Sequence, residues 1–474
     1  MKICLSIAPN SMRDALKMLR DFRDTPDLIE VRIDGIQDLN LAQLLHHPRP
    51  KVIITNRRKA EVGIFPGSAN QQYEILSEAI RLGAEYVDVE FSWGDKFTKN
   101  LLSQSNKTKV ICSYHNFKET PKKLESLYRK MRKTGAHIIK IATTANDIAD
   151  NKLIFDLLKQ SRRDKQKMIA LCMGVAGEIS RILGGKFGSY LTYASLTEKA
   201  KTADGQLTYN ELINLYDVDQ INYRTKVFGL VGNPVKQSKG IYFHNKIFIG
   251  KRLDAVYVNF LVCDLHVFIS KFRNVFNGLS VTMPFKEEIA NLLDRFELDS
   301  VRLGIYNTVI KRNDKLIGYN TDLPAMISLL KKRTNLRGKN VVVLGTGAIA
   351  KTMAYAALSN NCITTIIGRN PNKAEILAKE LGCEWTTFDD LHSLDPDILM
   401  NGTSVGMKGN RQQSIVPKSF FKKGMIVFDA VYNPVMTPLL QDAVKAGCEV
   451  ITGLELFEKQ AQLQSKLFIE SMKW

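Results

Sequence analysis

Residues 136–142 have the sequence AHIIKIA, in which one lysine, Lys140, stands among branched apolar residues. A short apolar run of this kind predicts a buried β-strand. An ammonium with apolar neighbours loses hydration, which favours a neutral amine that can attack a ketone. The preceding apolar run, KVICSYH at 109–115, ends on a histidine, which transfers protons near neutral pH. Lys140 and His115 are therefore candidate catalytic residues. The alternative is that Lys140 reaches solvent from a strand end and His115 closes a loop.

Similar apolar runs recur throughout the first 215 residues, and amphipathic helical patterns such as 71–82 and 124–131 lie between most of them. Strands that alternate with helices in this way predict a (β/α)8 TIM barrel, in which chemistry gathers at the carboxyl ends of the strands. The eight predicted strands are 3–7, 28–33, 52–55, 86–91, 110–114, 138–142, 168–173 and 190–194.

Charged residues interrupt several of these predicted strands, and buried charges must be paired or must bind a ligand. In LIEVRID and YVDVEF the charges are two residues apart, so each pair lies on one face of its strand. Asp88 and Glu90 are the first candidates for structural ion pairs. The charged residues that remain as candidate ligand contacts are Glu30, Arg32, Arg57 and Arg181.

The length of 474 residues predicts two or three domains, and 45% hydrophobic with 24% charged residues is ordinary for a globular protein. The longest apolar runs, such as 341–344, have the length of strands, so no membrane span is expected. Residues 1–9 are too short an apolar stretch for a signal peptide and predict a first strand. Seven scattered cysteines, without a C-x-x-C pair, predict reduced thiols, a cytoplasmic location and no metal site.

The net charge of +19 is dispersed along the chain and alternates with apolar helical stripes. Dispersed positive charge predicts solvated helix faces and attraction of small anions. No zinc finger, basic tail or aromatic RNA-binding signature is present, so nucleic-acid binding is a remote alternative. The oligomeric state is not predicted by any pattern in the sequence.

The stretch KNVVVLGTGAIAKTMAYAAL, beginning at Lys339, combines a buried strand, a glycine turn and an alanine-rich helix. Gly345 and Gly347 permit a tight turn that brings a pyrophosphate close to the helix N-terminus. The next strand, ITTIIGRN, ends on Arg369 rather than on an acid, and Lys373 follows. Positive charge at this place favours the 2′-phosphate of NADP(H) over NAD. A turn without a ligand, and an Arg369 that only faces solvent, are the alternatives. The cofactor-binding residues predicted by this motif are Gly345, Thr346, Gly347, Ala348, Ile349, Gly368, Arg369, Asn370 and Lys373.

The first half of the chain resembles type I 3-dehydroquinate dehydratases. The segments LIEVRID, ITNRRKAE, CSYHNF, HIIKIA, GEISRILGGKFGS and TADGQ occur in the order and spacing of that family. The resemblance implies that Lys140 forms a Schiff base with the substrate ketone, that His115 is the general acid and base, and that Glu61 orients His115. The family usually has serine where this chain has Thr202, which keeps the hydroxyl. The implied substrate contacts are Ser6, Glu30, Arg32, Arg57, Arg181, Thr202 and Gln206.

The second half resembles shikimate dehydrogenases through GNPVKQSKG, SVTMPFKE, YNTV, YNTD, NGTSVGM, VYNP and GLELFEKQAQ. The resemblance implies that Lys286 and Asp322 are catalytic and that Gly453 contacts the cofactor. A structural Lys–Asp ion pair is the alternative for the first two. One departure is Gly240, where the family usually has a second serine, so one carboxylate-binding hydroxyl is absent. The implied substrate contacts are Ser238, Thr282, Asn307, Tyr432 and Gln460.

These resemblances predict a TIM barrel over 1–215, a polar linker over 216–226, a substrate domain over 227–325 completed by 453–474, and a Rossmann domain over 326–452. They imply dehydration of 3-dehydroquinate followed by NADPH-dependent reduction of 3-dehydroshikimate to shikimate. Two other interpretations remain: a Schiff-base aldolase fused to a quinate or polyol dehydrogenase, and a sensor built from inactive copies of these domains. Presence of all four predicted catalytic side chains, Lys140, His115, Lys286 and Asp322, speaks against the sensor.

Overall fold

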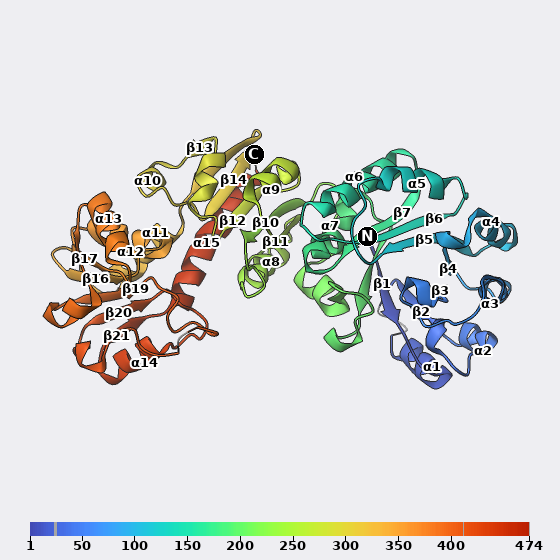
Figure 1. Ribbon diagram of the computed structural model, residues 1–474, viewed down its shortest axis with the longest axis horizontal. Coiled ribbons are helices and arrows are strands. Elements are labelled where there is room, and N and C mark those ends of the chain that lie inside the picture. Colours follow the sequence, from blue (N-terminus) through green and yellow to red (C-terminus); the bar gives the residue numbers. More distant parts are fainter. Residues whose placement is uncertain (23–25, 411, 474) are drawn as a thin grey trace. The chain divides into compact units, whose positions relative to one another are not determined.

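The computed structural model describes residues 1–22, 26–410 and 412–473 (Figure 1). The chain divides into two compact units. The first comprises Met1–Gly229 and Pro234–Phe276, and the second comprises Leu230–Asn233 and Asn277–Trp474. No helix within the described ranges is both long and apolar enough to cross a membrane.

The first unit contains the predicted parallel barrel sheet, with β1 to β8 at all eight predicted places. The strand order is β7-β6-β5-β4-β3-β2-β1-β8-β9, and each strand pairs in parallel with its neighbour in the chain up to β7. Strand β8 pairs with β1, and the N–H of Tyr190, just before β8, donates to the carbonyl of Met168 in β7 at 2.7 Å. The strands are Lys2–Ile7 (β1), Leu28–Arg32 (β2), Val52–Thr55 (β3), Tyr86–Glu90 (β4), Lys109–Asn116 (β5), Ile138–Thr144 (β6), Lys167–Met173 (β7) and Leu191–Ser195 (β8).

Helices connect these strands because their apolar residues recur at helical spacing, and a side chain caps the first turn of some of them. In α3, for example, Ser68 accepts from the N–H of Gln71 while the Gln71 side chain accepts from the N–H of Ser68, which forms a capping box. The same helix buries Leu76, Ala79 and Ile80. The helices of this unit are Met12–Asp21 (α1), Leu41–His46 (α2), Ala69–Arg81 (α3), Asp95–Gln104 (α4), Leu124–Arg132 (α5), Asp150–Arg163 (α6), Glu178–Phe187 (α7), Gly240–Gly250 (α8) and Leu265–Phe272 (α9).

The segment predicted as a linker packs on the first unit. Tyr216, Val218 and Ile221 are buried, and a Cβ on Gly185 of α7 would lie 2.7 Å from the carbonyl oxygen of Ile221. Three apolar side chains spaced irregularly do not form a helical or strand pattern, which is why the sequence indicated a polar connection. The short strand β9 (Leu207–Thr208) was also not predicted.

A second sheet has the strand order β11-β10-β12-β14-β15-β13. The helix α15 (Gly453–Ser471) covers β12 and β14, because Gln464 accepts from Ser280 Oγ at 2.8 Å and donates to the carbonyl of Asn307 at 3.1 Å. The strands are Lys226–Gly232 (β10), Ala255–Leu261 (β11), Gly278–Val281 (β12), Arg295–Phe296 (β13), Thr308–Arg312 (β14) and Lys315–Tyr319 (β15).

The third sheet is parallel and has the order β18-β17-β16-β19-β20-β21, which is the doubly wound Rossmann arrangement. Apolar strands and the alanine-rich α12 form its core, with Val343, Ala354 and Met400 fully buried. Helix α11 (Asp322–Lys331) leads into this sheet. The other elements are Asn340–Leu344 (β16), Ala348–Leu358 (α12), Ile363–Ile367 (β17), Pro371–Leu381 (α13), Glu384–Thr386 (β18), Ile398–Asn401 (β19), Ile426–Asp429 (β20), Pro438–Lys445 (α14) and Glu449–Ile451 (β21).

Candidate active sites

Lys140 lies in the middle of β6 and is 5% exposed. The prediction that its surroundings are apolar is wrong. Its Nζ lies 3.3 Å from Glu30 Oε1, 3.1 Å from Asp88 Oδ2 and 4.3 Å from the ring centroid of Tyr193. Ile139 and Ile141 alternate to the opposite face of the strand, so only Ile138 and Ala142 share the face of Lys140. Lys140 is therefore a buried amine paired with two carboxylates.

His115 lies at the carboxyl end of β5, where its Nδ1 is 2.9 Å from Glu61 Oε2. Burial lowers the pKa of His115 to about 4, and the positive charges of Arg57 and Lys140 act in the same direction. Burial alone would raise the pKa of Glu61, but the hydrogen bond with His115 and the nearby cationic charge hold it below its ordinary value. A neutral imidazole that donates from Nδ1 to a carboxylate leaves Nε2 as a proton acceptor. The pair has the composition of a general base with an orienting group.

Arg57 is almost fully buried and is already paired with acids. Its guanidinium lies 3.0 Å from Asp88 Oδ1, 3.3 Å from Glu90 Oε1 and 3.3 Å from Glu61 Oε2. Burial would raise the pKa of Asp88, but Arg57 and Lys140 hold it well below its usual range. The prediction that Asp88 and Glu90 form ion pairs is confirmed.

A chain of hydrogen bonds joins the small polar residues that the sequence analysis placed near the substrate. Ser6 Oγ donates to Glu30 Oε2 at 2.7 Å, and Thr202 Oγ1 donates to Ser6 Oγ at 3.3 Å. Gln206 Oε1 accepts from the N–H of Thr202 at 2.8 Å. Thr55, which was not predicted, donates to Glu30 Oε1 at 3.1 Å. These contacts bring β1, β2, β3 and the loop before β9 to one polar wall.

The two remaining predicted arginines differ in what they bind. Arg181 is 2% exposed in α7, and its Nη2 donates to the carbonyl of Asp204 at 3.3 Å. Its Nε is buried without a hydrogen-bond partner in the part of the chain that the structure describes. Such a donor is expected to serve a ligand, and burial lowers the pKa of Arg181 to about 10. Arg32 instead makes two bonds of 2.8 Å to Asp34.

In the second unit, Lys286 Nζ lies 2.6 Å from Asp322 Oδ2. Asp322 is the buried first residue of α11, while Lys286 is half-buried. Beside this pair, Asn307 Nδ2 donates to Thr321 Oγ1 at 3.0 Å, and Thr321 Oγ1 donates to Gln460 Oε1 at 3.4 Å. The structure thus brings together Lys286, Asp322, Asn307 and Gln460, which lie far apart in the sequence.

The other predicted substrate contacts are less constrained. Thr282 is half-buried just after β12, and the ring of Tyr432 packs against Phe457 with centroids 5.7 Å apart. Neither hydrogen-bonds to Lys286 or Asp322 within the described ranges. Ser238 lies in the first unit, in the turn before α8, and its Oγ accepts from the N–H of Gly240 at 3.1 Å.

The glycine turn after β16 fits a dinucleotide pyrophosphate. Gly345 has φ +112°, and a Cβ there would lie 3.0 Å from Thr403 Cγ2. Gly347 caps α12 without a side chain, and nothing lies within 4 Å of the Cβ it lacks. The N–H of Gly345 donates to the carbonyl of Ile367 at 2.7 Å, which sets the end of β17 beside the turn. The first N–H groups of α12 are therefore accessible to an anion.

The end of β17 offers two exposed cations to such a ligand. A Cβ on Gly368 would lie 2.7 Å from Thr346 Cγ2, so glycine is needed where the two turns meet. Asn370 Oδ1 caps α13 by accepting from the N–H of Lys373 at 3.2 Å. Within the described residues, no carboxylate pairs with Arg369 or Lys373. The remaining predicted cofactor residues are Ala348 and Ile349 in the first turn of α12, and Gly453, the buried first residue of α15.

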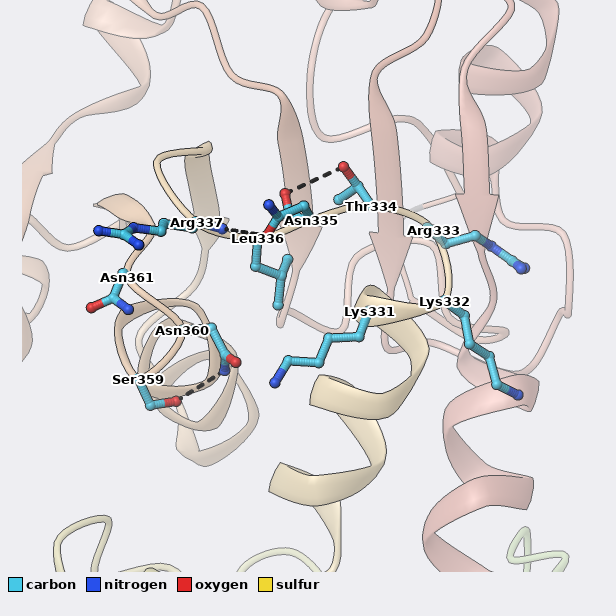
Figure 2. A pocket seen from close by; sticks show the side chains of 10 residues that line it. All are labelled: Lys331, Lys332, Arg333, Thr334, Asn335, Leu336, Arg337, Ser359, Asn360 and Asn361. Carbon is cyan, nitrogen blue, oxygen red and sulfur yellow. Dashed lines mark hydrogen bonds between the residues drawn. The ribbon is translucent and has the colours of Figure 1, made fainter.

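A basic hollow of about 620 Å³ lies at the opposite end of the same strands (Figure 2). It is lined by the loop before β16 and the turn before β17, and Lys331 points toward Asn360 there. The cofactor turn follows the carboxyl ends of β16 and β17, so this hollow is not the cofactor site. None of the predicted catalytic, substrate or cofactor residues lines it.

Comparisons with known proteins assign both halves. Residues 3–223 match the family model of type I 3-dehydroquinase, residues 230–309 the shikimate dehydrogenase substrate binding domain, and residues 328–423 shikimate / quinate 5-dehydrogenase. The bifunctional 3-dehydroquinate dehydratase/shikimate dehydrogenase of Arabidopsis thaliana is 35% identical over 469 residues, which covers 93% of this chain and 77% of the relative. The chain belongs to this bifunctional family.

Further relatives match the whole chain or its second half. The shikimate biosynthesis protein AroDE of Chlamydia pneumoniae is 28% identical, and the match covers 98% of this chain and 95% of that protein. A shikimate dehydrogenase (NADP(+)) of Pyrococcus abyssi is 39% identical over 246 residues, or 51% of this chain and 92% of the relative.

Several residues of the dehydratase half were not predicted as site residues from the sequence. Asp34 follows Arg32 at strand spacing and could have been found by the same reasoning that paired Glu30 with Arg32. Ser92 donates to Glu61 Oε1 at 2.9 Å, and no sequence signal marks it, because it reaches Glu61 only through the fold. Tyr193 contacts Lys140 from β8 in the same way.

Proposed function

We propose that this bifunctional enzyme eliminates water from 3-dehydroquinate in its first half. We further propose that its second half reduces the product, 3-dehydroshikimate, to shikimate with NADPH. The observation that carries the proposal is the Lys140 amine, held inside the barrel between two carboxylates, together with the neutral His115 on the next strand. Family membership and the Lys286–Asp322 pair support the second reaction.

In the dehydration, the amine of Lys140 attacks the substrate ketone, and loss of water forms an imine. The imine withdraws electrons from the adjacent C–H, whose proton passes to the neutral His115. The electron pair then expels the hydroxyl group on the next carbon, and His115 returns its proton to it, so that water leaves. A second water hydrolyses the imine, which releases 3-dehydroshikimate and restores the amine of Lys140. Glu61 stabilises the imidazolium that exists between the two transfers.

The substrate is held by complementary polar groups. Arg181 offers a buried, unpartnered N–H to the substrate carboxylate, and its guanidinium matches that group in shape. The wall formed by Ser6, Glu30, Thr202 and Gln206 presents hydroxyl, carboxylate and amide groups to the substrate hydroxyls.

In the reduction, bound NADPH supplies the hydride. Lys286 donates the proton that the carbonyl oxygen needs, and Asp322 orients the ammonium at 2.6 Å. Asn307 and Gln460 lie beside this pair and hold the substrate through their amides. Thr282 and Tyr432 complete the contacts within the second unit, and Ser238 is proposed from the resemblance alone. Gly345 and Gly347 make room for the cofactor pyrophosphate, and Arg369 with Lys373 bind its 2′-phosphate.

We also assign the domains as a barrel over 1–215, a substrate domain over 227–325 with 453–474, and a Rossmann domain over 326–452. Seven cysteines without a disulfide support a reducing compartment such as the cytoplasm.

Borohydride reduction in the presence of 3-dehydroquinate tests the proposal directly. The reductant converts the imine to a stable amine, so the peptide that contains Lys140 gains the mass of the reduced adduct and dehydration stops. The control is the same treatment without substrate, after which activity remains. If dehydration continues after the treatment and Lys140 carries no adduct, or if the adduct forms on another lysine, the elimination does not use Lys140.

A further inference from the structure

Arg58, the neighbour of Arg57, contacts four different groups beside the dehydratase site, one of which is Glu61, whose Oε1 lies 3.8 Å from Arg58 Nη2. Its Nε lies 2.5 Å from Glu90 Oε2, and its Nη2 donates to Ser92 Oγ. Its guanidinium stacks over the ring of Trp93 at 4.5 Å from the centroid. Glu90 is 1% exposed, whereas the Arg58 side chain is 22% exposed. A half-exposed cation thus reaches inward to a buried carboxylate and a hydroxyl.

The hydroxyl of Ser92 transmits this contact to the catalytic pair. Because Ser92 accepts from Arg58, its single proton is directed to Glu61 Oε1, at 2.9 Å. The other oxygen of Glu61 accepts from His115 Nδ1 at 2.9 Å and from Arg57 Nη1 at 3.3 Å. Both oxygens of Glu61 are therefore held: Oε1 by Ser92, and Oε2 by His115 and Arg57.

Arg58 also balances charge where two carboxylates share one guanidinium. Arg57 Nη1 lies 3.3 Å from Glu61 and 3.3 Å from Glu90. Burial, with repulsion from Glu61, raises the pKa of Glu90 to about 7 even with both arginines present. Without Arg58, Arg57 alone would face both acids as well as Asp88. Glu90 would then compete with Glu61 for the remaining guanidinium.

We propose that Arg58 is a positioning residue, which holds Glu61 in place through Ser92 and through its own contact with Glu61 at 3.8 Å. Glu61 in turn fixes the aim of His115. Within the described residues Arg58 contacts neither His115 nor Lys140, so it is not a catalytic residue. The inference rests on the proposed dehydration. The charged and titratable groups that face this network are Arg57, Glu61, Asp88, Glu90 and His115, with Lys140 behind them.

The test compares Arg58→Gln, Arg58→Lys and Ser92→Ala in the full chain, with kcat and KM for dehydration measured against pH. Arg129→Gln is the matched control, because Arg129 is exposed on α5 and, in the part of the chain that the structure describes, its ion-pair partner is Glu125 alone. Arg58→Gln should lower kcat by about 10- to 100-fold, because a small misplacement of a catalytic group has an effect of this size. KM should stay within about threefold of the wild-type value. Loss of the cation should also move the acid limb of kcat to higher pH, because Glu61 and Glu90 then hold protons more tightly.

Compared with Arg58→Gln, Arg58→Lys should restore the wild-type pH profile and part of kcat. Lysine keeps the positive charge but lacks the planar set of N–H donors of a guanidinium. Ser92→Ala should lower kcat, while borohydride still traps the Lys140 adduct in every variant. A loss of kcat with an unmoved pH profile and no rescue by lysine overturns the proposal, as does full activity in Arg58→Gln and Ser92→Ala. Wild-type protein that gives no trapped adduct and no dehydration would instead show that the proposed function itself is wrong.

Discussion

The dehydratase site separates two ionisable groups by giving them different partners. Lys140 faces Glu30 and Asp88, whereas His115 faces Glu61. Strand register sets this division, because Ser113 of β5 lies opposite Lys140 in β6 and His115 lies two residues further along. The amine is thus kept near carboxylates from β2 and β4, and the imidazole is kept near the mouth of the barrel. One group is suited to covalent attack and the other to proton transfer.

The pH dependence of dehydration follows from His115. Because burial and neighbouring cations lower the pKa of His115 to about 4, its basic form persists well below pH 6.5. We expect kcat/KM, which reports the free enzyme, to stay within about twofold of its neutral value down to about pH 5. A steady-state profile between pH 4 and 8 checks this, with circular dichroism as the control for folding. A half-maximal point near pH 6.5 would contradict a buried neutral imidazole.

The sequence predicted Lys140 and His115 as candidate catalytic residues and, through the resemblance, Glu61 as the partner of His115, but it did not predict the ion pairs of Lys140. Lys140 stands out because it is a charge within an apolar strand, and His115 because it ends one. Glu30 is 110 residues from Lys140 in the chain, so no local pattern could reveal that the amine is ion-paired. Ser92 was missed for the same reason, since its contact with Glu61 spans 31 residues.

At the scale of elements, the barrel strands were predicted because strands buried on both faces are nearly continuous apolar runs. Each of the eight keeps a short apolar run, even where a charge interrupts it as in β2, β4 and β6, so their positions could be predicted. The two-residue strand β9 lacks it and was missed. The connection 216–226 was predicted as a polar linker, and the burial of three of its side chains was not predicted because they follow neither periodicity.

The end of β17 decides cofactor choice, and a charge reversal there tests it. Arg369→Asp should weaken NADPH binding by about 10- to 100-fold, since it replaces a charge-assisted contact to the 2′-phosphate with repulsion. NADH binding should change by less than about threefold, because NADH has no such phosphate. Fluorescence titration of both cofactors measures the ratio. Lys379→Asp, on the exposed end of α13, is the matched control for the change in net charge. An equal loss for NADPH and NADH would exclude a 2′-phosphate contact at Arg369.

At the scale of the whole molecule, each candidate site draws its polar contacts from its own stretch of chain. Lys140 contacts residues from β2 and β4, and Lys286 contacts the first residue of α11. Those residues belong to different compact units. On the proposed assignment, the acid, base and orienting groups of each reaction lie within one unit, so the two activities should be separable by mutation.

Lys140→Ala should lower dehydration of 3-dehydroquinate by more than about 1,000-fold, because no amine remains to form the imine. NADPH-dependent reduction of added 3-dehydroshikimate should stay within about twofold of wild type, because Lys286 and Asp322 keep their 2.6 Å contact. Lys286→Ala is the reciprocal control, which should lose reduction and keep dehydration. Separate assays, one by absorbance of the enone and one by oxidation of NADPH, measure the two activities. If either variant loses both activities while it still folds, the halves depend on each other and the assignment of independent sites fails.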